Sequence, residues 1–160
     1  MIDYEAAWAP FDERFDFEPD FHERGKSAIR LHPDCLVIDL AGLFASPAAR
    51  LGAGTQAITA AALRAFVWLV GQDDLVALNW NHLAWQYSPA HNAVRYADPL
   101  DLPVPVFPNG DCYVHMEPRA RWGTFGHPWQ ESLCVWGDEL VDSLGAELLT
   151  WLPRHRWSPL

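Results

Sequence analysis

The chain has 160 residues, half of them hydrophobic, and acidic residues outnumber basic ones by 21 to 11. A chain of this length forms one domain that buries about 70% of its unfolded surface, and the composition excludes an intrinsically disordered protein. The formal net charge of −10 favours solubility or a basic protein partner and repels phosphate backbones and anionic lipids, so we expect neither nucleic acid nor membrane binding.

The first residues interleave aromatic and acidic side chains. Helical spacing of Trp8, Phe11 and Phe15 predicts a short helix with Pro10 in its first turn. The alternation from Phe15 to Glu18 predicts a strand directly after it. Such a mixture favours either anchoring in the core or an arm that contacts a partner.

The middle of the chain predicts one buried strand and one helix. Cys35–Leu40 is an apolar run of strand length, and the Gly- and Ala-rich residues 41–54 predict a loop. Thr55 is the expected N-cap of the helix, and Gly71 suits its C′ position. The apolar stripe of this helix consists of Ile58, Ala62, Phe66 and Leu69.

The second half predicts several strands. Leu75–Trp80 is the first, followed by a loop from Pro89 to Pro103. Val104–Phe107 predicts an edge strand, because the flanking prolines cannot donate to a ladder. The turn Pro108-Asn109-Gly110 would join it in a hairpin to a strand at Asp111–Glu117.

A last strand is predicted at Ser132–Trp136, and Asp138 is the expected N-cap of a final helix that Gly145 weakens or ends early. The apolar side of this helix is formed by Leu140, Leu144 and Leu148. Residues 151–160 are expected to be irregular. No linker divides the chain, so residues 1–160 are predicted to form a single α+β domain, with a largely antiparallel sheet covered by helices.

Three cysteines, Cys35, Cys112 and Cys134, fit neither a disulfide framework nor a zinc site, because the number is odd and no C-x-x-C pair occurs. The N-terminus lacks the basic and apolar regions of a signal peptide. The longest apolar run, Ala57–Gly71, contains Arg64 and is short for a membrane span. We therefore expect a cytoplasmic protein without a metal ion or cofactor.

The signatures of phosphate-binding loops, dinucleotide-binding folds, serine hydrolases and zincins are absent from the sequence. A first candidate site is the predicted strand in which Asp111, Tyr113, His115 and Glu117 alternate with apolar residues. These four side chains share one face and form either a catalytic wall or a solvated or covered face of the sheet.

A second candidate site is the predicted loop Gly123–Glu131. Its glycines and Pro128 would fix His127 as a general base or ligand. Alternatively, His127 would bond to backbone while Trp129 and Phe125 fill the core. A third is Asn79-Trp80-Asn81-His82 with Trp85 and Tyr87, whose rings and amides suit a planar ligand or sugar but also suit a strand end with buried rings.

Four segments carry a family resemblance: 78–82 (LNWNH), 107–111 (FPNGD), 123–129 (GTFGHPW) and 134–140 (CVWGDEL). They resemble a widespread bacterial family known only as a domain of unknown function, over about residues 8–140. In that family the place of Asn79 more often holds Asp, and that of His115 an apolar residue or Phe. The resemblance implies no activity, and it marks Asp111, His127, Trp129 and Glu139 as matching positions.

Two functions remain open. The first is a protein-binding or regulatory module, such as an immunity-like protein that neutralises a basic toxin. The alternative is a small enzyme or ligand-binding protein with a pocket around Asp111 and His127, which His82 or Glu139 would complete. Trp80, Trp129 and Tyr113 are the candidate binding residues. A third possibility, carbohydrate binding, requires a row of exposed tryptophans.

Overall fold

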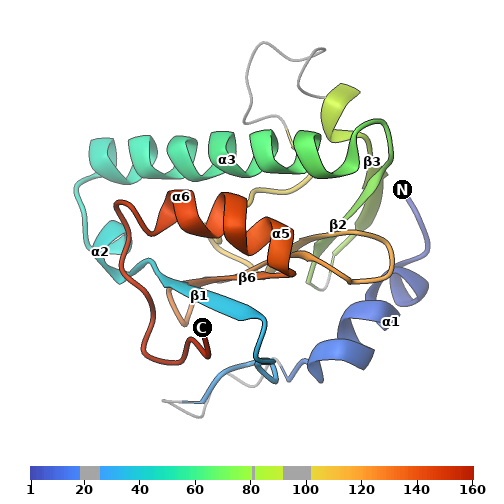
Figure 1. The fold of residues 1–160 in the computed structure, drawn as a ribbon, viewed down its shortest axis with the longest axis horizontal. Coiled ribbons are helices and arrows are strands. Elements are labelled where there is room, and N and C mark those ends of the chain that lie inside the picture. Colours follow the sequence, from blue (N-terminus) through green and yellow to red (C-terminus); the bar gives the residue numbers. More distant parts are fainter. Residues whose placement is uncertain (19–25, 81, 92–101) are drawn as a thin grey trace.

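One six-stranded antiparallel sheet forms the centre of the computed structural model, which describes residues 1–18, 26–80, 82–91 and 102–160 (Figure 1). The strand order is β1-β6-β5-β4-β2-β3. The strands are β1 (Cys35–Asp39), β2 (Leu75–Asn79), β3 (Ala84–Tyr87), β4 (Tyr113–Met116), β5 (Gly123–His127) and β6 (Ser132–Trp136). The predicted α+β fold with a largely antiparallel sheet is therefore confirmed.

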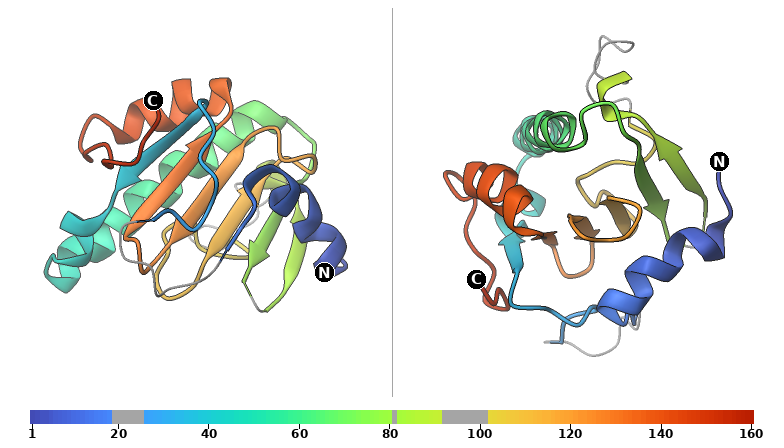
Figure 2. Two further views of the ribbon diagram at one scale, coloured as in Figure 1. Left: turned by 90° about the horizontal axis from the view of Figure 1, so that it is seen from below. Right: turned by 45° about the vertical axis from the view of Figure 1, so that its right-hand side comes forward.

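Helices cover both faces of this sheet (Figures 1 and 2). On one face lie α3 (Ala48–Val70) and a continuous helical run made of α5 (Asp138–Leu140), the π-helical η1 (Val141–Gly145) and α6 (Ala146–Leu148). The short α2 (Ala41–Phe44) precedes α3. On the opposite face lies α1 (Tyr4–Phe15), so the buried side chains form two clusters, one on each side of the sheet.

The α1 helix is held by a cap at its start and by aromatic burial along one side. The carboxylate of Asp3 accepts from the N–H of Ala6 at 2.8 Å. Trp8, Phe11 and Phe15 are buried as the spacing predicts, but Pro10 lies inside the helix rather than in its first turn. The predicted strand from Phe15 is wrong, because Asp16 is left-handed, with φ of 51°, and turns the chain away.

The α3 helix begins earlier than predicted. It starts at Ala48 with Pro47 as N-cap, so the loop predicted over residues 41–54 is wrong. Thr55 is not the N-cap: it lies inside the helix and its hydroxyl donates to the carbonyl of Leu51 at 2.9 Å. Glycine disfavours the interior of a helix, but at Gly54 packing requires it. A Cβ at this position would lie 2.7 Å from Cδ2 of Leu43.

The end of α3 is the one predicted, with Gly71 as its cap at φ of 61°. By length and composition alone, this 23-residue helix would suffice to cross a membrane. Its inner side, which includes Ile58, Ala62 and Phe66, packs against the sheet with no exposed surface. A core helix of a folded domain meets the same criteria.

The segment Gly123–His127, predicted as a loop, is the buried strand β5, hydrogen-bonded to β4 and β6. Its glycines allow close approach of neighbouring segments rather than unusual backbone angles. A Cβ at Gly123 would lie 2.4 Å from the carbonyl oxygen of His115, and one at Gly126 would lie 3.1 Å from that of Val106.

The segment Val104–Phe107 is not an edge strand, and the predicted hairpin is wrong: β4 pairs with β2 and β5 instead. Because Pro103 and Pro105 lack N–H groups, the segment packs into the core on the α3 face without joining a ladder. The predicted loop from Pro89 to Pro103 falls mainly on residues 92–101, outside the described residues; its residues 89–91 are helical.

The C-terminal helical run begins after Gly137, which is its N-cap in place of the predicted Asp138. Its predicted apolar residues Leu140, Leu144 and Leu148 are all fully buried. Gly145 does not end the helix: it lies in η1, where a Cβ would come within 2.7 Å of Leu36 on β1. The glycine thus lets the helix approach the sheet closely.

Residues near the two chain ends partly cover the outer edges of the sheet. The N–H of Ile2 donates to the carbonyl of Ala84 on β3 at 3.1 Å. Along β1, the N–H of His155 donates to Val37 and the N–H of Asp39 donates to Pro153. The tail is otherwise irregular, as predicted, and it protects an edge that other strands would pair with.

Candidate functional site

The predicted strand Asp111–Glu117 is shorter than expected. Of its four polar side chains, β4 contains only Tyr113 and His115, and both are part of the core, whereas Asp111 and Glu117 lie outside the strand and are half-buried. Tyr113 and His115 point into the cluster on the α3 face, while Cys112, Val114 and Met116 belong to the opposite cluster. The imidazole of His115 is fully buried: its Nε2 donates to the carbonyl of Val104 at 3.1 Å and its Nδ1 accepts from the hydroxyl of Tyr87 at 2.8 Å. Both ring nitrogens are satisfied in this way, which makes His115 a structural residue.

Of the other predicted catalytic residues, Asp111, His82 and His127 lie at one end of the sheet, and Glu139 lies beyond the opposite end. Asp111 contacts His82, with 3.3 Å between Oδ2 and Nε2, at the end of the sheet where β2 ends and β4 begins. His127 lies at the corresponding end of β5, since Gly126 is opposite Tyr113. Glu139 lies beyond the other end of β5 and β6, because Gly123 pairs with Trp136, so it is remote from this group.

The His127 side chain packs on the α1 face, as its neighbour Phe125 does, with ring centroids 5.8 Å apart. It is 2% exposed, and its Nδ1 accepts from the N–H of Gln130 at 3.1 Å. Burial lowers the pKa of His127 to about 4, so the ring is neutral near pH 7. A pocket shared by Asp111 and His127 stays a prediction.

The tryptophans that face solvent come from separate elements. Trp68 on α3, Trp129 in the β5–β6 turn and Trp151 in the tail are 80%, 55% and 42% exposed. Trp129 packs against His127, with ring centroids 5.7 Å apart, so it does not fill the core. Three rings on three different elements give no support to a row of sugar-stacking platforms.

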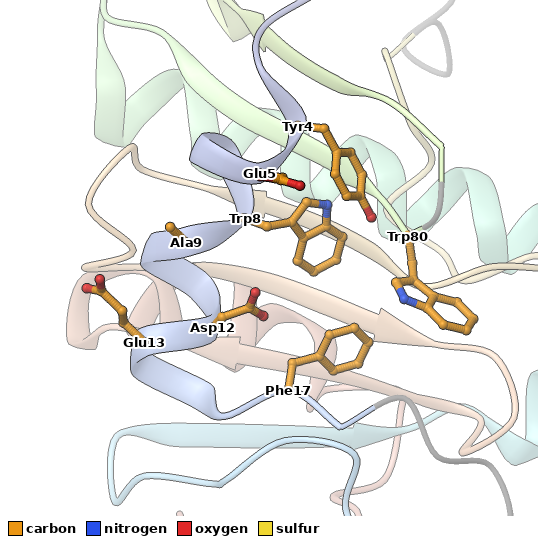
Figure 3. Close-up of a pocket in the computed structure, with 8 residues that line it drawn as sticks. All are labelled: Tyr4, Glu5, Trp8, Ala9, Asp12, Glu13, Phe17 and Trp80. Atoms are coloured by element: carbon orange, nitrogen blue, oxygen red, sulfur yellow. The ribbon is translucent and has the colours of Figure 1, made fainter.

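Trp80, by contrast, lines a cavity of about 520 Å³ beside α1 (Figure 3). We call this cavity the α1 hollow; its lining residues are Tyr4, Glu5, Trp8, Ala9, Asp12, Glu13, Phe17 and Trp80. Trp8 forms its buried wall, and the rings of Tyr4, Phe17 and Trp80 are half-buried around it. Phe17 stacks on Trp8 with centroids 5.6 Å apart and stands edge-on to Trp80 at 6.4 Å.

The rim of the α1 hollow is acidic. Glu5, Asp12 and Glu13 are exposed, and within the described residues none of them has a cationic partner. The first 18 residues contain six acids and one base, which is half of the net charge of the chain. That base, Arg14, is paired with Asp34 at 2.6 Å. Desolvation by partial burial raises the pKa of the Asp12 carboxyl.

A second cavity, of about 360 Å³, lies between α2, α3 and the C-terminal tail. Its lining is apolar except for the exposed Arg50. Within the described ranges, no group of three or more His, Cys, Asp or Glu residues is arranged to hold a metal ion. Neither Asp111 nor His127 lines either of these two cavities, and of the two the α1 hollow combines aromatic walls with an acidic rim.

Of the residues of the α1 hollow, the sequence alone identifies Trp80 as a binding candidate. The acids of α1 carry a detectable signal, because Glu5, Asp12 and Glu13 are seven and eight residues apart and so share one side of a helix. What the sequence does not show is that Trp80, more than sixty residues later, meets that side. This contact is set by the pairing of β2 with β4 and the docking of α1.

Comparison with known proteins gives a family but no activity. A family model described as "Protein of unknown function (DUF2716)" matches residues 2–141. An uncharacterised protein of Bacillus subtilis (strain 168), YxiI, is 39% identical over 83 residues. This match covers 51% of each protein, so the chain spans about half the length of that relative. No solved structure matches the chain. The chain belongs to the DUF2716 family of proteins of unknown function.

Proposed function

We propose that this protein is a binding module that takes a basic segment of a partner protein into the α1 hollow. The observation that carries the proposal is a set of three carboxylates, Glu5, Asp12 and Glu13, which have no cationic partner among the described residues and surround half-buried aromatic rings. An unpaired cation of the partner would find both a counterion and a ring face there.

The charge of the whole chain supports the same kind of partner. A net charge of −10 attracts basic proteins at a distance and accelerates their association, and it repels acidic ones. An immunity-like role, in which the basic partner is a toxin held inactive, is one form of this proposal. The partner segment is defined here by its chemistry, as a stretch rich in Lys and Arg.

Neutralising the rim is expected to weaken this binding. In the triple variant Glu5→Gln, Asp12→Asn, Glu13→Gln, affinity for a basic peptide of eight residues should fall about tenfold at low salt, since each exposed pair contributes about 0.5 kcal/mol. The loss should shrink at high salt, because ions screen exposed charges. Titration calorimetry at two salt concentrations measures both effects.

The matched control changes the same net charge elsewhere. Asp73, Asp138 and Asp142 are exposed acids outside the α1 hollow, and their triple change to Asn should alter affinity less than threefold. Equal losses in the two triple variants would mean that only overall charge matters and that the α1 hollow is not the binding site. Absence of binding by the unmodified protein would refute the function itself.

A further inference from the structure

The buried wall of the α1 hollow contains a polar group that has no partner among the described residues. The Trp8 side chain is 4% exposed, and within the described residues its indole N–H has no hydrogen-bond acceptor. The nitrogen lies on the edge of the ring that faces Tyr4 and Glu5 (Figure 3). The nitrogen itself has almost no accessible surface, so a ligand reaches it only when the neighbouring Tyr4 or Glu5 side chain moves aside. A buried donor left unsatisfied costs about 1–3 kcal/mol, so an oxygen atom that a ligand brings there would be bound favourably.

The donor and the acidic rim together restrict the kind of ligand. Three carboxylates require a cation, whereas the Trp8 N–H requires an oxygen acceptor. A polyamine or a quaternary ammonium ion has the charge but no acceptor, and a free phosphate is repelled by the rim. A basic amino-acid residue within a peptide has both groups, since its main-chain carbonyl accepts while its side chain carries the charge.

The aromatic walls distinguish between the two basic side chains. A guanidinium group is planar, is weakly hydrated, stacks on aromatic rings and has five donors that can bond to separate carboxylates. A lysine ammonium is compact and strongly hydrated, so it loses more hydration free energy when it leaves water. The half-buried rings of Tyr4, Phe17 and Trp80, with acids two turns apart on α1, match the guanidinium better.

We propose that the α1 hollow binds an arginine residue, whose guanidinium lies against the aromatic walls and the carboxylates of Glu5 and Asp12 while a main-chain carbonyl accepts from the Trp8 indole. This inference rests on the proposed function and specifies the residue that the partner inserts. It also gives a reason for the buried, unsatisfied N–H, because the acceptor belongs to the partner.

The test uses small probes on the full chain labelled with ¹⁵N. N-acetyl-arginine amide has the guanidinium and the carbonyls, N-acetyl-lysine amide has the other cation, and agmatine has a guanidinium without a carbonyl. We expect the arginine amide to bind about tenfold more tightly than either other probe, and only the arginine amide to move the Trp8 indole proton downfield. The nine indole signals are followed by two-dimensional NMR.

Two variants separate the contributions. Trp8→Phe removes the donor and should abolish the preference for the arginine amide over agmatine while guanidinium binding persists. Trp80→Leu changes a half-buried wall residue. It should lower the affinity for the arginine amide at least threefold, and the affinity for the lysine amide less. If Trp8→Phe does not fold, the indole shift of the unmodified protein, assigned by through-space correlations, still decides the carbonyl contact.

The possible failures are distinguishable. Equal affinity for the arginine and lysine amides would overturn the arginine preference and leave the proposed function standing. Binding of the arginine amide without a shift of the Trp8 indole would overturn the carbonyl contact. Failure of every basic peptide and probe to bind would remove the proposed function together with this inference.

Discussion

Replacing Trp136 by alanine is expected to destabilise the protein by about 3–5 kcal/mol, which is much of the stability of a typical domain. Trp136 is fully buried on β6 and packs against Phe15 and Phe11 of α1, with ring centroids 4.7 and 5.9 Å away. Its indole N–H donates to the carbonyl of Ala120 at 3.0 Å. Alanine would leave a cavity under α1 and a buried carbonyl without a donor.

Urea unfolding followed by circular dichroism measures this loss. Trp68→Ala is the matched control, because Trp68 is 80% exposed and its removal should change stability by no more than about 0.5 kcal/mol. Trp136→Phe keeps much of the packing but loses the hydrogen bond, so it should fall between the two. If Trp136→Ala costs no more than the control, the docking of α1 does not depend on this residue.

The second large effect is a loss of stability with acid, caused by two buried imidazoles. Burial lowers the pKa of both His115 and His127 from 6.5 to about 4. Between these values the unfolded chain binds protons that the folded chain does not, so stability is full above pH 6.5 and falls as the pH drops towards 4. Each residue would remove up to about 3 kcal/mol over this window.

Urea unfolding midpoints at pH 7, 6 and 5 measure how stability changes with pH. A double variant isolates the part of this change that is due to His115. In the double variant Tyr87→Phe, His115→Phe, the titrating ring and the hydroxyl bonded to it are replaced together. The carbonyl of Val104 loses its donor, which lowers stability by a similar amount at every pH and leaves the change with pH interpretable. This variant should lose roughly half of the dependence on pH between 6.5 and 4. A wild-type midpoint that stays constant from pH 7 to 5 would contradict both pKa shifts.

Elements with a strong local pattern could be predicted from the sequence. The apolar run at Cys35 became β1, Gly71 ends α3, and the leucines from Leu140 to Leu148 face the core. Each of these signals depends on residues within a few positions of one another, such as a helix-ending glycine or a repeat of 3.6 residues. In these elements the long-range packing agrees with the local pattern.

The errors arise where distant contacts override local preference. Gly54 suggested a loop, but it lets α3 pack on Leu43, and Gly123 suggested a loop because its contact with Trp136 on β6 is invisible locally. Val104–Phe107 alternates like a strand, but its prolines keep it out of the ladder and it packs in the core, where the carbonyl of Val104 accepts from His115 on β4. In each case the deciding partner is remote in sequence.

The candidate site was predictable in its chemistry but not in its position. The interleaved acids and aromatics of α1 were open to two interpretations, core anchor or interaction arm, and the structure shows the first directly: Phe11 and Phe15 are fully buried. The exposed acids on the other side of the helix are available for contact with a partner, as an interaction arm would be. Trp80 was a candidate on its own, and only the fold brings it to α1.

The way in which the terminal segments flank the sheet has a practical consequence for handling this protein. Residues 153–155 form main-chain hydrogen bonds with β1, and Ile2 forms one with β3. Trimming either end by a protease, or fusing a bulky tag there, would uncover unpaired main-chain groups, which are the groups through which sheets of separate molecules join. Affinity handles are therefore better inserted into a surface turn than appended to the chain.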